Sequence, residues 1–288
     1  MTTRWQVALV SRAEGPEARR ALDAAAAAAV RAGATLRVIR AGTPLPLPGE
    51  FVGGQIHSLP VESTQQQLRA VALADGQADW VALTEDSAVV APDWVVRLAQ
   101  AVQPGIDVIG GVVEPPITGR LRDLGAYWAE YGWYGRHRRR TLAGAPPITM
   151  SSVAYRTAIL GRVASWTTQG HWEDSVHSLL ADLGHQFVVC GRAVVRHQER
   201  IEVSAFVRDR WRHGRDYTRR RLAGHPWHGR HLHALVTPIL PLLLLARLAS
   251  RTGRADRPGF IAAAPWTLLF LAAWAAGEAA GALRGDHR

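Results

Sequence analysis

The sequence predicts an α/β protein with a Rossmann-like mixed sheet, helices on both faces of the sheet, and an apolar helical hairpin at the C-terminal end. Two observations predict this class. Segments typical of buried strands alternate with helical segments over roughly the first hundred residues, as in sheets that contain parallel strands. Beyond residue 231 the composition changes to long apolar stretches. With 48% hydrophobic and 20% charged residues, the chain can build a packed core.

The alternation can be assigned element by element. Aliphatic and β-branched clusters predict strands at 5–10, 35–40, 79–84, 106–113, 149–155 and 186–197. Apolar residues recurring every three or four positions predict helices at 17–32, 63–75, 93–102 and 173–184. Irregular structure is expected at 42–54, which is rich in proline and glycine, in the aromatic segment after Pro116, and in a polar loop that follows residue 155.

The C-terminal third combines a basic amphipathic helix with two apolar segments. Within 203–222 one helical face is surrounded by arginines, a pattern typical of a helix at a membrane interface. The residues of that face are Val207, Trp211, Gly214, Thr218 and Leu222. Segment 259–277 approaches the length of about 20 residues that spans a bilayer. Segment 234–246 is shorter and contains two prolines, which leaves an interfacial helix, a re-entrant helix or a marginal span.

The positive charge favours a membrane partner over nucleic acid. The net charge is +10, and every basic residue other than histidine is an arginine. Arginines gather at 136–140 and at 208–230, and the second group runs directly into the apolar third. No base-reading motif is evident, so nucleic acid is not an expected partner. The histidines at 225, 228, 231 and 233 are interpreted as an interfacial collar rather than a metal cluster.

These features predict three regions along the chain. Residues 1–202 would form the α/β domain, 203–231 an interfacial helix with its linker, and 232–288 membrane-anchoring helices. The N-terminal apolar stretch is too short for a signal region, so we expect the α/β domain on the cytoplasmic face of the cytoplasmic membrane. Cys190 is the single cysteine, which excludes an intrachain disulfide, and its apolar neighbours predict a buried strand thiol.

Segment 78–94 (ADWVALTEDSAVVAPDW) resembles the core of family 2 glycosyltransferases, in particular a membrane-anchored branch of that family. Further pieces match in order across roughly residues 5–285. They are Gly110-Gly111, the aromatic stretch 131–134, segment 152–156, Trp172-Glu173-Asp174, Val195-Arg196-His197 and Arg210-Trp211. The resemblance implies a glycosyltransferase A-type fold in which residues 1–202 form the catalytic domain. It also implies transfer of a sugar from a nucleotide-diphosphate sugar to an acceptor hydroxyl, with inversion at the anomeric carbon.

The same resemblance implies roles for individual residues. Asp174 would be the catalytic base, with Glu173 beside it, because the acceptor hydroxyl must lose a proton. Glu85, Asp86 and His197 would hold a divalent cation, Mg²⁺ or Mn²⁺, that neutralises the departing diphosphate. The donor-binding set would be Ser11, Glu85, Asp86, Gly111, Arg210 and Trp211. The basic region next to the apolar segments favours a lipid-linked or membrane-proximal acceptor.

The sequence also departs from the family pattern. Aligned on Pro92-Asp93-Trp94, Ser87 stands where relatives have the last aspartate of the metal motif. Relatives commonly have an acidic residue after the second strand, whereas this chain reads Val38-Ile39-Arg40-Ala41-Gly42. An inactive membrane scaffold or nucleotide-sugar-binding protein is therefore the alternative hypothesis. Each motif also has a purely structural interpretation: a solvated turn for Glu85-Asp86, a complement to the helix dipole for Glu173-Asp174, and a strand-end histidine for His197.

Overall fold

The computed structural model forms two compact units, which are described separately. Unit 1 comprises Met1–Glu114 and Tyr134–Glu199, and unit 2 comprises Pro115–Trp133 and Arg200–Arg288. The structure describes residues 3–12, 14–48, 54–74, 78–116, 119–135, 146–198, 200–222 and 226–283. The arginine cluster expected at 136–140 and His225 lie outside these described residues.

Unit 1 is built on one mixed sheet of eight strands, in the order β3-β2-β1-β4-β7-β6-β8-β5. The strands are β1 (Trp5–Ser11), β2 (Thr35–Ala41), β3 (Gln55–Leu59), β4 (Trp80–Glu85), β5 (Ala88–Val90), β6 (Ile106–Glu114), β7 (Val153–Arg156) and β8 (Gln186–His197). Neighbours among β1 to β4 pair in parallel, and β7 runs antiparallel to both β4 and β6. The predicted mixed α/β sheet is therefore confirmed.

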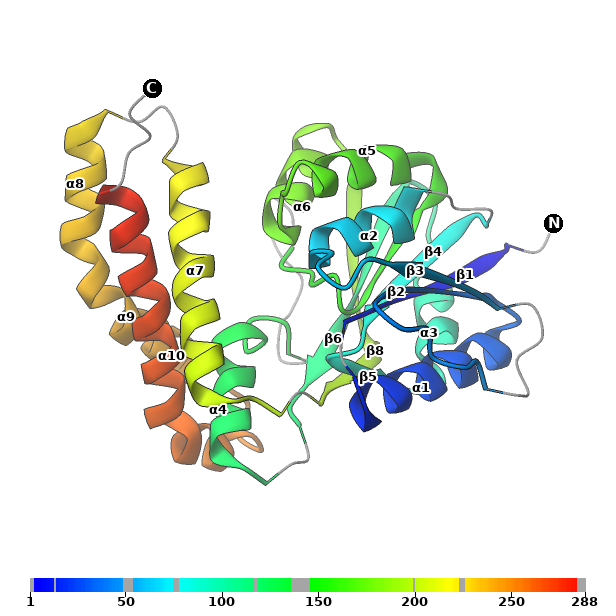
Figure 1. Ribbon diagram of the computed structural model, residues 1–288, viewed down its shortest axis with the longest axis horizontal. Coiled ribbons are helices and arrows are strands. Elements are labelled where there is room, and N and C mark those ends of the chain that lie inside the picture. The colour runs from blue at the N-terminus through cyan, green and yellow to red at the C-terminus, as the bar shows by residue number, and fades with distance from the viewer. Residues whose placement is uncertain are drawn as a thin grey trace. The chain divides into compact units, whose positions relative to one another are not determined.

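Helices cover both faces of this sheet. They are α1 (Pro16–Ala32), α2 (Gln65–Ala74), α3 (Trp94–Gln100), α5 (Thr157–Thr168) and α6 (Glu173–Asp182). Figure 1 shows α2, α5 and α6 over one face and α1 with α3 over the other. The alanines of α1 are largely buried, so the alanine run is close-packed helix, and Gly33 ends it in the left-handed conformation with φ 62°.

Several elements of unit 1 differ from the prediction. Strand β3 has mostly exposed or half-buried side chains, and β5 is only three residues long, so neither shows a clear hydrophobic pattern. The expected polar loop after residue 155 is largely the helix α5, whose apolar residues are interspersed with threonine and serine. Residues 149–152 form a buried turn, not a strand. Cys190 is half-buried rather than buried, and its Sγ lies 3.4 Å from the carbonyl oxygen of Arg97.

Unit 2 is entirely helical in the part that the structure describes. Its elements are α4 (Leu121–Glu130), α7 (Val203–Arg221), α8 (Trp227–Val236), the 3₁₀ turn η1 (Thr237–Ile239), α9 (Leu240–Arg251) and α10 (Arg257–Leu283). Helix α10 contacts α7, α4, α9 and α8 and so forms the centre of the unit (Figure 1). The sequence did not predict α4, which occupies the segment expected to be irregular.

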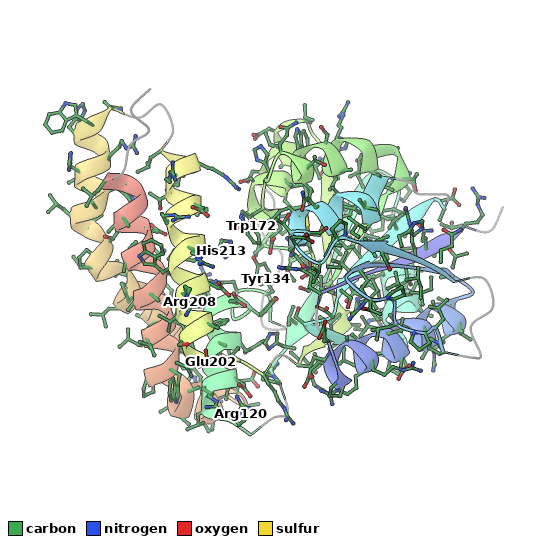
Figure 2. All side chains as sticks on the ribbon, viewed as in Figure 1. Arg120, Tyr134, Trp172, Glu202, Arg208 and His213 are labelled. Carbon is green, nitrogen blue, oxygen red and sulfur yellow. The ribbon has the colours of Figure 1, made fainter. Side chains whose placement is uncertain are left out.

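The predicted basic helix is present as α7, with a buried face that differs from the expected one. Phe206, Arg210, Gly214, Thr218 and Leu222 are its buried residues, four positions apart, so Phe206 and Arg210 replace Val207 and Trp211 on that face. Glu202, at the start of α7 in Figure 2, accepts hydrogen bonds from the backbone N–H groups of Ser204 and Ala205. The Ser204 hydroxyl also donates a hydrogen bond to this carboxylate. The three bonds lower the pKa of Glu202, and the one from the hydroxyl has the largest effect.

Glycines bring α7 and α10 into close contact. A Cβ atom added at Gly277 would lie 2.0 Å from the Trp211 carbonyl oxygen, and one added at Gly281 would lie 2.3 Å from the Arg215 carbonyl oxygen. From the other side, a Cβ at Gly214 would lie 2.2 Å from the Trp274 carbonyl oxygen. The backbones touch because no side chain separates them, as in the small-residue contacts of membrane helices. The glycine spacing on α10 therefore fixes the position of the arginine-rich helix.

Candidate active site

The carboxyl ends of β1 and β4 lie side by side in unit 1. The register of this parallel pair sets Val10 opposite Glu85, so the residues that follow each strand meet at one edge of the sheet. Ligands of such sheets bind at this edge. Ser11 is buried there, and its Oγ accepts a 2.8 Å hydrogen bond from Nη1 of Arg40. Arg40, noted above as a departure from the family pattern, therefore belongs to this edge.

Glu85 is a buried carboxylate held by an arginine that the sequence did not single out. Nε of Arg69 lies 2.5 Å from Oε1 of Glu85, and the Ser151 hydroxyl donates to Oε2 over 3.3 Å. Nη1 of the same arginine lies 3.1 Å from Oε2 of Glu173, at the start of α6. The Arg69 guanidinium also lies 5.6 Å from the centre of the Trp172 ring. Arg69 thus joins the end of β4 to the start of α6 through two ion pairs.

Asp86 is buried as well, so the solvated-turn interpretation of Glu85-Asp86 is wrong. Its Oδ2 accepts a 2.5 Å hydrogen bond from the backbone N–H of Arg12, and its own N–H donates to the Val10 carbonyl. The carbonyl oxygen of Asp86 accepts from Nε2 of Gln198 over 2.7 Å. The backbone N–H of Gln198 donates to the Ser87 carbonyl, so the segment after β8 holds the acidic turn from the other side.

Glu173 and Asp174 are the first two residues of α6. The pKa of Asp174 is raised to about 6. Desolvation by the surrounding protein is the largest cause, although part of the side chain is exposed to solvent. The negative charge of Glu173 adds to the shift, and a hydrogen bond from Tyr134 opposes it. A carboxylate with a pKa nearer to neutrality is a stronger base than an ordinary aspartate.

A buried Tyr–His pair lies near this cluster. The Tyr155 hydroxyl and Nε2 of His177 are 2.7 Å apart. Burial raises the pKa of Tyr155 and lowers the pKa of His177 to about 3, so the phenol stays protonated and the imidazole stays neutral. A neutral imidazole carries one proton, so the histidine tautomer decides which of the two groups donates. Because His177 is one helical turn after Glu173 on α6, the pair fixes this helix against β7.

The three predicted metal ligands do not assemble into one site. Among the residues that the structure describes, no three histidine, cysteine, aspartate or glutamate side chains converge to hold a metal ion. His197 is buried at the end of β8, where it pairs in register with Ala88 of β5, and Glu85 is engaged by Arg69. A cation held by Glu85, Asp86 and His197 together, as the resemblance implied, is therefore not supported by this geometry.

The remaining predicted residues fall in two places. Gly111 lies within β6, where an added Cβ would meet the Ser152 hydroxyl at 2.1 Å and the Ala193 carbonyl at 2.5 Å, so it serves close packing. Its role in donor binding stays a prediction. Arg210 and Trp211 belong to α7 in unit 2. There Arg210 pairs with Glu130 at 3.0 Å and lies over the Trp274 ring at 4.5 Å.

Sequence reasoning missed five residues of this site: Arg69, Ser151, Tyr155, His177 and Gln198. One of them carried a signal, because Arg69 stands between Leu68 and Ala70 in a helix whose next turn is apolar. A charged residue inside an apolar helical stretch is rarely buried without a partner of opposite charge. Ser151, Tyr155, His177 and Gln198 depend on contacts between distant segments, which one sequence does not reveal.

Comparisons with known proteins identify the fold. No protein-family profile matches the sequence, and a search of curated proteins finds no match either. A solved structure of the mannosyltransferase PcManGT from Pyrobaculum calidifontis, in complex with GDP-Man and Mn²⁺, matches with a TM-score of 0.50 and 16% identity. The match covers 95% of this chain and 74% of that one. The chain therefore has the glycosyltransferase A-type fold.

Two further solved structures are similar with lower scores. Residues 1–349 of TarS from S. aureus match with a TM-score of 0.47 and 13% identity, over 91% of this chain and 81% of that one. Glucosyl-3-phosphoglycerate synthase from Mycobacterium tuberculosis, in complex with Mn²⁺, UDP and phosphoglyceric acid, matches with a TM-score of 0.39 and 14% identity. That match covers 69% of this chain and 72% of the other.

Proposed function

We propose that the chain is a glycosyltransferase that moves a sugar from a nucleotide-diphosphate sugar to an acceptor hydroxyl. The observation that carries the proposal is the cluster at the carboxyl edge of the sheet. Asp174, with its raised pKa, stands beside Glu173, and Arg69 links Glu173 to Glu85. This cluster lies in a fold shared with a mannosyltransferase solved with GDP-Man.

In the proposed mechanism, Asp174 accepts the proton of the acceptor hydroxyl as its oxygen attacks the anomeric carbon. The bond between that carbon and the diphosphate oxygen breaks, and the nucleoside diphosphate leaves with the bonding electrons. Direct displacement of this kind inverts the anomeric configuration. Arg69 acts as a positioning residue, since it holds Glu173 beside the base and Glu85 at the end of β4.

A divalent cation enters the proposal in a limited form. Asp86, together with phosphate oxygens of the donor, fits the way in which Mg²⁺ is commonly held, by one or two carboxylates and substrate phosphates. Bound there, the cation would neutralise charge on the departing diphosphate. The exposed apolar helices of unit 2 support a membrane-proximal acceptor, and we propose a lipid-linked hydroxyl.

The test is turnover by the full chain, purified in detergent, across a panel of nucleotide sugars with EDTA, Mg²⁺ or Mn²⁺. Release of nucleoside diphosphate is measured for the wild type, for Asp174→Asn and for Asp182→Asn. Asp182 is exposed at the other end of α6, which makes it a matched control. We expect Asp174→Asn to lower the rate by about 10²- to 10⁴-fold, and Asp182→Asn to leave it unchanged.

Donor binding measured by calorimetry separates the proposal from its alternative. An enzyme that has lost only its base still binds the donor, so Asp174→Asn should retain the wild-type affinity. If the wild type binds a nucleotide sugar and releases no diphosphate under any condition, the chain is a nucleotide-sugar-binding scaffold. The ion pair between Glu85 and Arg69, which occupies an expected metal ligand, would then be the first place to look for the lost activity.

A further inference from the structure

The helical segment from α8 through α9 carries an apolar face that unit 2 leaves uncovered. Its residues recur every three or four positions, so they lie on one side of the helix. They are Leu232, Leu235, Val236, Ile239, Leu242 and Leu243, with exposed fractions between 44% and 75%. The opposite side carries the buried Thr237, Pro241 and Leu248. The uncovered face therefore points away from the interior of unit 2.

Helix α10 has an uncovered stripe of the same kind. Ile261 is 68% exposed, Leu269 is 42% exposed and Leu283 is 56% exposed. The exposed residues between them at the same helical spacing are Ala262, Pro265, Ala272 and Ala276, so the stripe contains no charged or hydrogen-bonding side chain. In a protein surrounded only by water, apolar surface of this extent is unusual.

The other faces of α10 are covered by helices that carry charge. Along its C-terminal half α10 packs against α7, through the three glycine contacts and through Phe206 and Phe270, whose rings are 4.6 Å apart. Along its N-terminal half it packs against α4, where Trp128 meets Phe260 with ring centres 5.1 Å apart. The exposed side chains of α7 include Arg208, Arg212, Arg219, Arg220 and Arg221.

This covering decides how unit 2 can meet a membrane. By length and composition alone, Trp227–Arg251 and Arg257–Leu283 could each cross a bilayer. If α10 crossed, the glycine contacts would carry α7 and its arginines into the hydrocarbon, where charged side chains are strongly unfavourable. If α10 lies in the membrane plane, only its uncovered stripe enters the acyl region and α7 stays in the headgroup layer or in water.

We propose that unit 2 is a one-sided membrane anchor, in which the segment α8–α9 and helix α10 lie in one leaflet and neither crosses the bilayer. The occupant of the apolar faces is a lipid surface that contains anionic headgroups. Charge complementarity supports this choice, since Arg230 stands near the start of α8, and Arg247, Arg251, Arg254 and Arg257 stand around the turn between α9 and α10. Trp227, 73% exposed at the start of α8, is an aromatic residue suited to the interface.

Sidedness of the helix ends tests the proposal directly. Single cysteines are placed in a Cys190→Ser background: Val30→Cys as an exposed reference in unit 1, Trp227→Cys before the apolar face, Arg254→Cys in the turn between α9 and α10, and His287→Cys, which follows α10 in the sequence. Sealed vesicles of both orientations are then treated with a membrane-impermeant maleimide. We expect all four positions to react from the same side. Labelling of Arg254→Cys from the opposite side would overturn the proposal and establish a crossing hairpin.

Vesicle flotation tests the lipid surface itself. We expect the full chain to float with phosphatidylcholine vesicles that contain phosphatidylglycerol, and to bind them at least about tenfold more tightly than vesicles of phosphatidylcholine alone. Leu235→Glu should weaken binding by about tenfold or more, because one exposed anchor residue no longer enters the acyl region. Val30→Glu, on the surface of α1, is the matched control and should leave binding unchanged.

The flotation and labelling results do not depend on the proposed glycosyltransferase activity, because they measure lipid binding and topology. Absence of wild-type flotation with either vesicle would overturn the proposal in favour of a protein partner for the apolar faces. Circular dichroism of Leu235→Glu identifies a variant that has failed to fold, and the cysteine labelling then still decides the topology.

Discussion

Unit 1 and unit 2 each bury one arginine against an indole ring, and the two arginines differ in the charge that surrounds them. Arg69 in unit 1 meets two carboxylates, Glu85 and Glu173, and lies over Trp172. Arg210 in unit 2 meets Glu130 and lies over Trp274. Among these groups, unit 1 retains one negative charge in excess, whereas the pair in unit 2 is neutral.

The difference indicates which of the two clusters is suited to chemistry. A neutral buried pair holds helices together and perturbs little around it. In unit 1, desolvation raises the pKa of Asp174 and the negative charge of Glu173 raises it further, so this carboxylate, with a pKa of about 6, can accept a proton near neutral pH. Ion pairs with similar geometry can thus have different roles, and the charge balance of the surrounding cluster distinguishes them.

The largest expected effect on stability comes from removing each of the two arginines. Arg69→Met leaves two carboxylates without their shared cation, one of them almost fully buried, and should lower the free energy of unfolding by about 3–5 kcal/mol. Arg210→Met should cost less, because Glu130 is partly exposed and can be hydrated. Urea denaturation followed by circular dichroism measures both. Arg19→Met, which breaks an exposed pair with Asp23, is the control and should change stability by less than about 1 kcal/mol. Equal losses for Arg69→Met and Arg210→Met would contradict the distinction between the units.

Glycine substitutions should give a smaller effect, with a sign that depends on the site. Gly277→Ala places a methyl group against the Trp211 carbonyl and should destabilise the protein by about 1–3 kcal/mol. Gly229→Ala, in α8, meets no atom within 4 Å and should stabilise it by about 0.5–1 kcal/mol. The midpoint of thermal unfolding reports both changes. If both variants shift the midpoint in the same direction, the close contact between α7 and α10 is not present in solution.

The smallest expected effect is a shift of a pH profile. Asp174 must be ionised to accept a proton, so kcat/KM should fall as the pH drops through about 6. Glu173→Gln removes a neighbouring negative charge that raises this pKa, so the acidic limb should move to lower pH, whereas Asp182→Asn should leave it in place. A limb that stays fixed in Glu173→Gln would assign it to another group.

The same pKa has a consequence for stability, with a definite sign. Because the folded pKa of Asp174 lies above its ordinary value of 3.8, the fold disfavours the charged form. Stability from this group is therefore highest below pH 4 and falls as the pH rises through about 6. Asp174→Asn should raise the midpoint of thermal unfolding at pH 8 and lose that advantage at pH 4.

The fold was largely predictable because its signals are local. The strands of unit 1 that are buried on both faces, such as β1 and β4, are built around short apolar runs at 7–10 and 80–83, and α1 and α6 show clear helical spacing. The elements that were missed have weak local patterns. Strand β3 is mostly exposed, and α4 contains a glycine at its contact with α10, so its helical character depends on a partner far along the sequence.

Of the candidate site, the sequence motifs predicted the acidic pairs but not the residues that hold them. The acidic residues at 85, 86, 173 and 174 stand out as pairs next to apolar segments, and the structure links the two pairs through Arg69. The metal set was not predictable, because it depends on where the carboxylates point and on which partners hold them. An arginine between Glu85 and Glu173 comes from a third segment of the chain, and one sequence does not show which segments meet.

Helix α4 also shapes the order in which the chain can fold. It is synthesised long before α10, the helix that packs against it through Phe260 on Trp128 and Trp266 on Gly125. The sheet of unit 1 can be completed once β8 has emerged, whereas α4 and α7 must both wait for α10 to be made. During that interval the nascent chain presents an aromatic helix without the helix it packs against most extensively, a species prone to aggregation unless a chaperone or a membrane surface covers it. Completion of α10 is therefore the step that ends this exposure for both helices at once.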